Sequence, residues 1–165
     1  MPNPTLCELL RGKGAHVDPV ACIEDLSLDL ANRTVSGFPH PIWQVVEHMN
    51  YWMEYELRRI ACDPPAYPDH AIESWPNEST VSGGQWQDSV NRFVALLDRL
   101  CRLADSDSET LGQPVAPDPS KINRPVTVEM VLWQIAAHNS YHIGQIAMLR
   151  RMLGAWPPKA GGDTW

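Results

Sequence analysis

Two histidines, His138 and His142, stand four residues apart near the C-terminal end of the chain. In an α-helix this spacing places two side chains on adjacent turns of one face, which is the separation at which two imidazoles can share one metal ion. Both histidines fall on the same helical stripe as Ile135, Ile146 and Leu149. Because that stripe is apolar, the pattern predicts that both imidazoles point toward the core.

A third histidine, His48, is one turn from Val45 and from Trp52 in an earlier apolar segment. Three neutral imidazoles from two helices would hold a metal ion and leave a position for water or substrate, as in catalytic metal centres. The alternative is packing, since a core histidine is usually satisfied by a neighbouring carbonyl or carboxylate. Adjacent buried imidazoles without a shared ligand would each need such a partner and would have to resist protonation together. Periodicity alone leaves open whether the three rings converge.

Other residues near the histidines in sequence are candidates for orienting a ligand or a substrate, although each is equally at home in a core or on a helix surface. The near-site candidates of this kind are Trp52, Tyr55 and Gln145, and His16 is added to them although it lies in a glycine-containing loop where exposure is the expectation. The remaining histidines are His40, near a helix start, and His70, in a proline-rich linker, and both are expected to be exposed. The seven tryptophans are interpreted as packing residues, with an aromatic substrate pocket as the alternative.

Four segments with helical periodicity must position these side chains, and they predict an all-α four-helix bundle with long proline-rich connections. Their expected bounds are about 18–32, 41–62, 85–106 and 127–153. Asp18 before Pro19 and Pro41 at a first turn are helix-start signals, whereas Thr127 is a plausible cap and Gly154 a natural stop. The segment 149–152, which contains two arginines, is expected to be a solvated helix end rather than an anion site.

The composition limits the classes of function. A chain of 165 residues is expected to form one domain, 1–165, and 13 Lys plus Arg against 20 Asp plus Glu give a net charge of −7. This charge argues against nucleic acid or an anionic membrane as the main partner. Four widely spaced cysteines without a C-x-x-C pair, and no export signal or membrane span, predict a cytoplasmic protein. The role of the glycine-rich tail, 160–165, stays open.

Three sequence elements carry a resemblance to a known family. They are VVEHMNYW at 45–52, AHNSYHIGQI at 137–146 and LGAWPP at 153–158. Together they resemble the DinB-like (DinB/YfiT) superfamily of bacterial proteins, and the resemblance covers nearly the whole chain. It implies an up-down-down-up four-helix bundle, commonly a homodimer, with a metal ion held by His48, His138 and His142.

Characterised members of that superfamily include S-transferases that use low-molecular-weight thiols, a mycothiol-dependent isomerase and metal-dependent hydrolases, while many members have no assigned reaction. The resemblance therefore implies a metal-dependent transferase or hydrolase that uses an activated thiol or water on a small-molecule substrate. The alternative is a non-catalytic, stress-related dimer in which the ion only fastens two helices together. Three imidazoles suit zinc, nickel, iron and copper alike, so the sequence does not name the metal.

Overall fold

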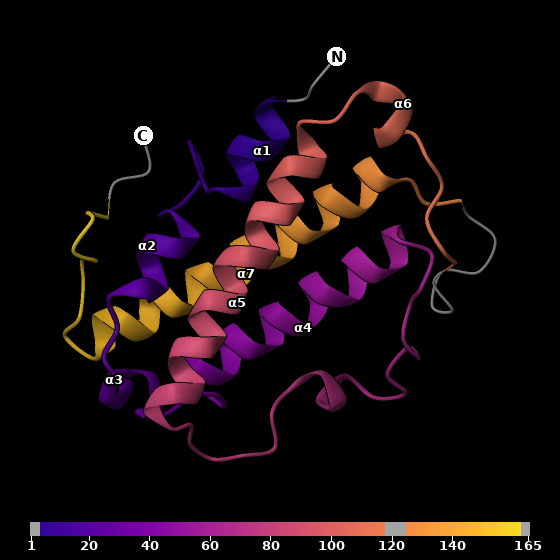
Figure 1. Ribbon diagram of the computed structural model, residues 1–165. Coiled ribbons are helices and arrows are strands. Elements are labelled where there is room, and N and C mark those ends of the chain that lie inside the picture. Colours follow the sequence, from indigo (N-terminus) through magenta and orange to yellow (C-terminus); the bar gives the residue numbers. More distant parts are fainter. Residues whose placement is uncertain (1–3, 118–124, 163–165) are drawn as a thin grey trace.

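Three long helices form the body of the molecule: α4 (Ile42–Ile60), α5 (Gly83–Ala104) and α7 (Val128–Met152). The computed structural model describes residues 4–117 and 125–162. Helix α4 packs against both α5 and α7. Figure 1 shows that α4 and α5 run in the same direction and that α7 runs opposite to them. Two parallel neighbours need a long connection, which the chain supplies between Ile60 and Gly83.

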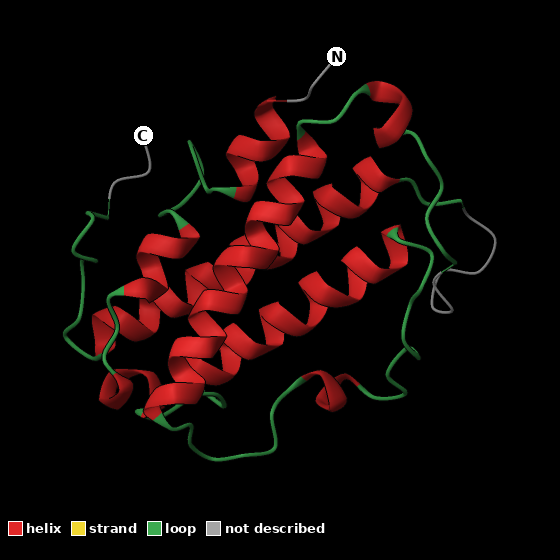
Figure 2. Cartoon of the chain, viewed as in Figure 1, coloured by secondary structure: helices red, strands yellow, loops and turns green. Residues whose placement is uncertain are grey.

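The remaining helices are short. Helices α1 (Pro4–Leu10) and α2 (Pro19–Glu24) lie along α5 and α7, and together they occupy the fourth position of the bundle (Figure 1). Helix α3 (Leu28–Asn32), the 3-10 helix η1 (Ala71–Ser74) and helix α6 (Ser108–Leu111) sit in the connections. As Figure 2 shows, the described residues form helices and loops, so the chain is all-α.

Local sequence explains where the long helices begin. Ser82 and Gln85 form a reciprocal capping box at the start of α5, and the Thr127 hydroxyl accepts a hydrogen bond from the Met130 N–H at the start of α7. Helix α4 follows Pro41, which has no N–H to leave unpaired. Each of these helices begins and ends within two residues of its predicted bounds.

The first predicted helix, 18–32, is wrong as a single helix because the structure divides it into α2 and α3. Asp18 caps α2 by accepting hydrogen bonds from two backbone N–H groups, as predicted. The chain then leaves the helix at Asp25, and Ser27 caps α3 by accepting a bond from Leu30 N–H. A serine side chain competes with the helical backbone in this way, so a second cap inside an apolar pattern ends one helix and starts another.

The expectation of a solvated end at 149–152 is also wrong in part. Arg151 and Met152 are exposed, but Arg150 is only 2% exposed and forms an ion pair with Asp25. Helix α7 packs against α2 here, and this contact removes Arg150 from solvent.

Within the described ranges no helix is long and apolar enough to cross a membrane. The last three residues of the glycine-rich tail, including Trp165, lie outside the described residues.

Candidate metal centre

The three predicted histidines meet where α4 and α7 pack together. His48 lies on α4, whereas His138 and His142 lie on successive turns of α7. One ligand atom from each of the three lies within 4.8 Å of the others, a separation that permits all three to bind one metal ion. Among the described residues the cluster contains no carboxylate or thiol. We refer to these three side chains as the histidine triad.

Burial shields the triad from solvent. His48 is 7% exposed and His142 is 5% exposed, and His138 is half-buried. Burial is the main reason why the pKa of His48 falls to about 3 and that of His138 to about 4, and the neighbouring imidazole of His142 lowers both further. Burial also lowers the pKa of His142. All three rings are therefore neutral near pH 7, which is the protonation state that metal binding requires.

Each ring uses its Nδ1 atom for a hydrogen bond to an oxygen. His48 Nδ1 lies 3.2 Å from the backbone carbonyl of Ser74, and His142 Nδ1 lies 2.8 Å from Oε1 of Gln145. The nearest partner of His138 Nδ1 is Oδ1 of Asn139, at 3.4 Å. A carbonyl oxygen only accepts, so these contacts place the proton on Nδ1 and leave a lone pair on Nε2.

Two of the free Nε2 atoms face each other. Nε2 of His48 and Nε2 of His138 are 3.3 Å apart. Two nitrogens that both present lone pairs repel at this distance unless a cation lies between them. Two imidazole nitrogens at about 2.0–2.1 Å from one ion, at a tetrahedral angle, would be about 3.3–3.4 Å apart. The donor set therefore fits a divalent metal ion, and the Nδ1 hydrogen bonds fix the ring orientations as they do in metal sites.

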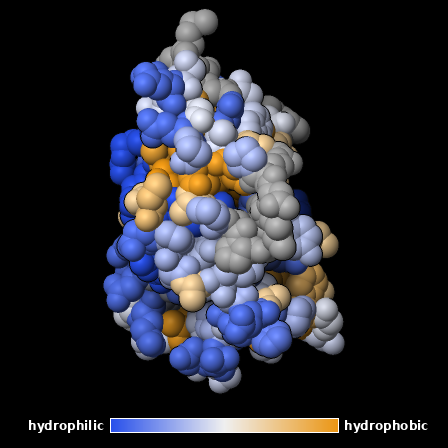
Figure 3. Space-filling model, turned by 90° about the vertical axis from the view of Figure 1, so that its right-hand side faces the viewer, coloured by the Kyte–Doolittle hydropathy of each residue, from blue (hydrophilic) through white to orange (hydrophobic). Residues whose placement is uncertain are grey.

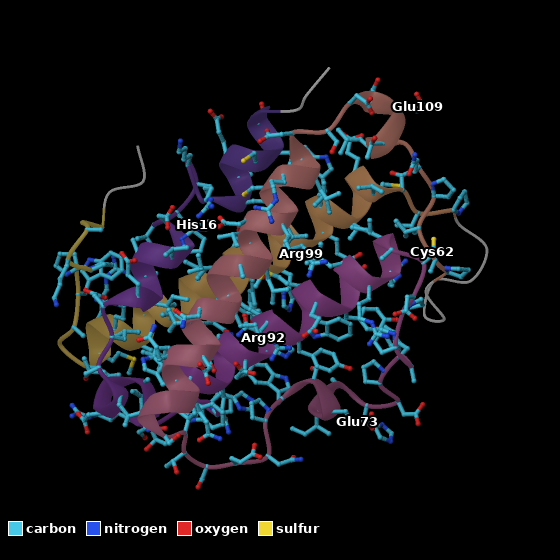
Figure 4. All side chains as sticks on the ribbon, viewed as in Figure 1. His16, Cys62, Glu73, Arg92, Arg99 and Glu109 are labelled. Atoms are coloured by element: carbon cyan, nitrogen blue, oxygen red, sulfur yellow. The ribbon has the colours of Figure 1, made fainter. Side chains whose placement is uncertain are left out.

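A segment that the sequence analysis left out covers one side of the triad. Trp75, directly after η1, stacks flat on His48 with ring centroids 3.9 Å apart, and His40 stacks on its other face at 3.8 Å. The hydroxyl of Ser74 also contacts His48 Nδ1, at 3.1 Å. No periodic pattern marks this proline-rich connection as part of a site, so the sequence analysis did not include Ser74 and Trp75 among the candidates. His40, which precedes α4, was expected to be exposed but stacks on Trp75. Figure 4 locates η1 through its residue Glu73.

The near-site candidates differ in their distance from the triad. Gln145 contacts His142 directly, and Trp52 lies edge-on to His48 with ring centroids 6.5 Å apart. Tyr55 packs on Trp52, one ring further out.

His16 comes from the loop between α1 and α2 (Figure 4), where Nε2 of its ring contacts the Ser140 hydroxyl at 2.9 Å. His16 is therefore a neighbour of α7 but not a member of the cluster.

Comparison with protein-family models adds a separate finding. The model described as the DinB superfamily matches residues 19–146, which is most of the chain and includes the whole triad. The comparisons with curated proteins and with solved structures returned no match.

Proposed function

The chain belongs to the DinB superfamily, and from this premise we propose that it is a metal-dependent enzyme. In this proposal His48, His138 and His142 bind one divalent ion through Nε2. The ion would lower the pKa of a thiol or of water, so that the nucleophile forms near neutral pH for attack on an electrophilic small molecule. The observation that carries the proposal is that one ring nitrogen from each of the three imidazoles lies within 4.8 Å of the others, while each Nδ1 has an oxygen as its hydrogen-bond partner.

Of the two nucleophiles, we propose the thiol of an external low-molecular-weight cofactor. The support for this choice is the resemblance to superfamily members that transfer such thiols. All four cysteines of the chain are free, so no disulfide ties its own thiols together. A reducing, cytoplasmic setting is part of the proposal, because both the free cysteines and a thiol cofactor persist there.

Three residues would assist without binding the ion. The carbonyl of Ser74 and Oε1 of Gln145 hold the Nδ1 protons of His48 and His142, which keeps each Nε2 aimed at the centre. Trp75 covers the flat face of His48 and excludes water from that side. These contacts preorganise the ligand set before any ion binds.

Elemental analysis tests the metal site directly. Untagged protein purified without added metal is expected to contain close to one equivalent of a divalent metal, and His142→Ala is expected to contain little. His70→Ala is the matched control, since His70 is exposed and lies outside the cluster. A wild-type protein without bound metal, or a His142→Ala protein with undiminished metal, contradicts the proposal.

The alternative function is a non-catalytic protein in which the ion only fastens α4 to α7. Three nitrogen ligands favour catalysis over this role, because structural zinc sites are closed by a fourth protein ligand. Turnover assays of the metal-loaded protein with a panel of thiols and electrophiles separate the two functions. If the loaded protein turns over no member of the panel, the structural role is favoured.

We also propose that the chain forms a homodimer through the exposed face of α7. This face carries Trp133, Tyr141, Met148 and Met152, whose exposed fractions are 41%, 66%, 50% and 54%. Large exposed apolar side chains gathered on one helix are typical of an interface. Gly144 lies on the same face, and a Cβ there would meet nothing within 4 Å, so no contact inside the chain explains the glycine.

Light scattering of the purified protein tests the dimer. We expect a dimeric mass at micromolar concentration for the wild type and a monomeric mass for Met148→Glu, because the substitution places two charges at a symmetric interface. Ile72→Glu is the matched control, since Ile72 is 62% exposed but lies on η1. A monomeric wild-type protein contradicts the dimer.

A further inference from the structure

A pocket of about 210 Å³ borders the triad on one side. His142 forms part of the wall of this pocket. Trp75 also lines the pocket and separates it from His48, on which Trp75 stacks. The other walls come from the loop before α4, which contributes Phe38 and His40, and from α7, which contributes Tyr141 and Gln145. We call this space the His142 pocket. A molecule inside it would lie against the ring of one proposed metal ligand.

The size of the His142 pocket limits what it can hold. A cavity of about 150 Å³ lined by apolar side chains accommodates one benzene molecule. The observed 210 Å³ therefore suits a single substituted ring or an aliphatic molecule of similar bulk. It lies below the range of about 300–1,000 Å³ that is usual for drug-sized ligands.

The charge of the lining limits the ligand further. Among the described residues that line the His142 pocket there is no Asp, Glu, Lys or Arg, although the chain as a whole carries a net charge of −7. Apolar side chains, including Val45 and Leu149, complete the wall. A charged group that entered this space would lose its hydration without gaining an opposite charge from the lining. The lining favours an uncharged molecule.

Hydrogen bonds fix which nitrogen of His40, a residue that lines the His142 pocket, can accept a hydrogen bond. The amide nitrogen of Gln44 donates to the backbone carbonyls of Pro76 and Glu78, at 3.4 and 2.8 Å, so the oxygen of the same amide faces His40. That oxygen lies 2.9 Å from His40 Nδ1. The proton of a neutral His40 is therefore on Nδ1, and its Nε2 atom is left as an acceptor.

Gln145 supplies a donor to the same space. Its Oε1 atom accepts the hydrogen bond from Nδ1 of His142, so the amide N–H groups remain for another partner. The lining thus combines apolar side chains with a few polar ones that offer both an acceptor and a donor, the composition typical of a small-molecule site.

We propose that the His142 pocket binds the substrate of the metal centre and that this substrate is a small uncharged molecule, about one substituted ring in size, with both a hydrogen-bond donor and an acceptor. The inference rests on the proposed function for the role of the bound molecule as substrate. The preference for size and charge rests on the lining alone.

Binding of three probes of equal size, measured by isothermal titration calorimetry on the metal-loaded protein, tests the proposal. The probes are benzamide, which is neutral and carries both a donor and an acceptor, benzoate and benzylammonium. Benzamide is expected to bind at least about tenfold more tightly than either ion, because an unpaired charge loses far more hydration free energy on entry than a neutral amide does. Equal or tighter binding of benzoate or benzylammonium overturns the proposal.

Substitutions that fill the pocket show where benzamide binds. Phe38→Trp and Val45→Phe are each expected to weaken benzamide binding at least about tenfold. Phe38 lies in the loop before α4, whereas Val45 lies on α4 itself. If one of the two variants fails to fold, the other still tests where benzamide binds. Leu103→Trp is the matched control, because Leu103 lines a different hollow, of about 350 Å³, near the C-terminal end of α4. Hydrophobic residues are exposed on the face that carries this end of α4 (Figure 3).

Metal content, measured on the same samples, separates this inference from the proposed function. If the wild type holds metal but benzamide fails to bind, or binds unchanged in both filled variants, the inference is overturned and the metal centre stands. If the wild type retains no metal after the loading step but benzamide still binds as expected, the preference of the pocket is supported and the proposed function fails.

Discussion

The side chains of His142 and Arg150 lie two turns apart on α7, and both are at most 5% exposed. The guanidinium of Arg150 is satisfied within the chain. It donates to both carboxylate oxygens of Asp25 and to the backbone carbonyls of Cys22 and Ala155. The imidazole of His142 has Gln145 as the hydrogen-bond partner of its Nδ1, and the ring lies beside those of His48 and His138, with centroids 4.8 and 4.5 Å away.

This difference separates a structural polar cluster from a candidate site. Burial acts to raise the pKa of Asp25, but hydrogen bonds from Arg150 and from Lys159 N–H outweigh it, so the pKa is lowered and the carboxylate stays charged beside the guanidinium. In the triad the imidazoles of His142 and His138 disfavour a charge on His48, His142 also disfavours a charge on His138, and the cluster supplies no carboxylate to compensate. A buried polar cluster whose hydrogen-bonding groups are all paired within the chain stabilises the fold. A buried cluster that keeps unpaired lone pairs can bind a ligand with them.

The largest expected effect is on the completed cluster. Arg150→Ala removes one member of a buried ion pair and leaves the Asp25 carboxylate without its partner. The free energy of unfolding is expected to fall by about 3–5 kcal/mol, as measured by urea denaturation. Arg151→Ala is the control, since its side chain is exposed and packs over Trp156. A loss as small as that of the control would contradict the structural role of the pair.

Metal addition should stabilise the folded protein through the triad alone. At a free metal concentration about 1,000-fold above Kd, the wild type is expected to gain about 4 kcal/mol of unfolding free energy. Thermal denaturation with and without a chelator measures this gain. His142→Ala should gain almost nothing, whereas Arg150→Ala should gain as much as the wild type if it remains folded. An equal gain in His142→Ala would show that the ion binds elsewhere.

The hydrogen bond between His142 Nδ1 and Gln145 provides a third test of the difference between the two clusters. Gln145→Leu keeps the bulk of the side chain but removes the acceptor of the Nδ1 proton. The affinity for the metal ion is expected to fall roughly 10- to 100-fold, as measured by competition with a chelator. The control is Gln87→Leu on the exposed side of α5, which should bind metal like the wild type. Unchanged affinity in Gln145→Leu would mean that this bond does not orient the ring.

The smallest effect is the pH dependence of the metal-free protein. The folded-state pKa of His48, about 3, lies below its ordinary value of 6.5, so the unfolded chain binds a proton more readily than the folded chain. Stability is therefore complete above about pH 6.5 and is lost as the pH falls toward 3, with about 1–2 kcal/mol lost at His48 between about pH 7 and pH 5. Urea denaturation of wild type and His48→Leu in the presence of a chelator measures this difference. Equal slopes for the two proteins would contradict it.

Part of this picture could be predicted from the sequence. The apolar periodicity and the end signals predict the three long helices closely, because helix starts depend on nearby residues such as Ser82 and Thr127. The spacing of His138 and His142 fixes their common face for the same reason. The break inside 18–32 was missed because the apolar pattern continues through it, and only the second cap at Ser27 marks it.

The sequence by itself determined which residues are available and which of them share a helix face, since both follow from the geometry of a single helix. Only the tertiary structure decided that His48 meets the other two rings, that Trp75 lies between His40 and His48, and that Arg150 is buried against Asp25. Each of these contacts joins segments far apart in the chain. Their geometry depends on how helices and connections pack, which no local pattern specifies.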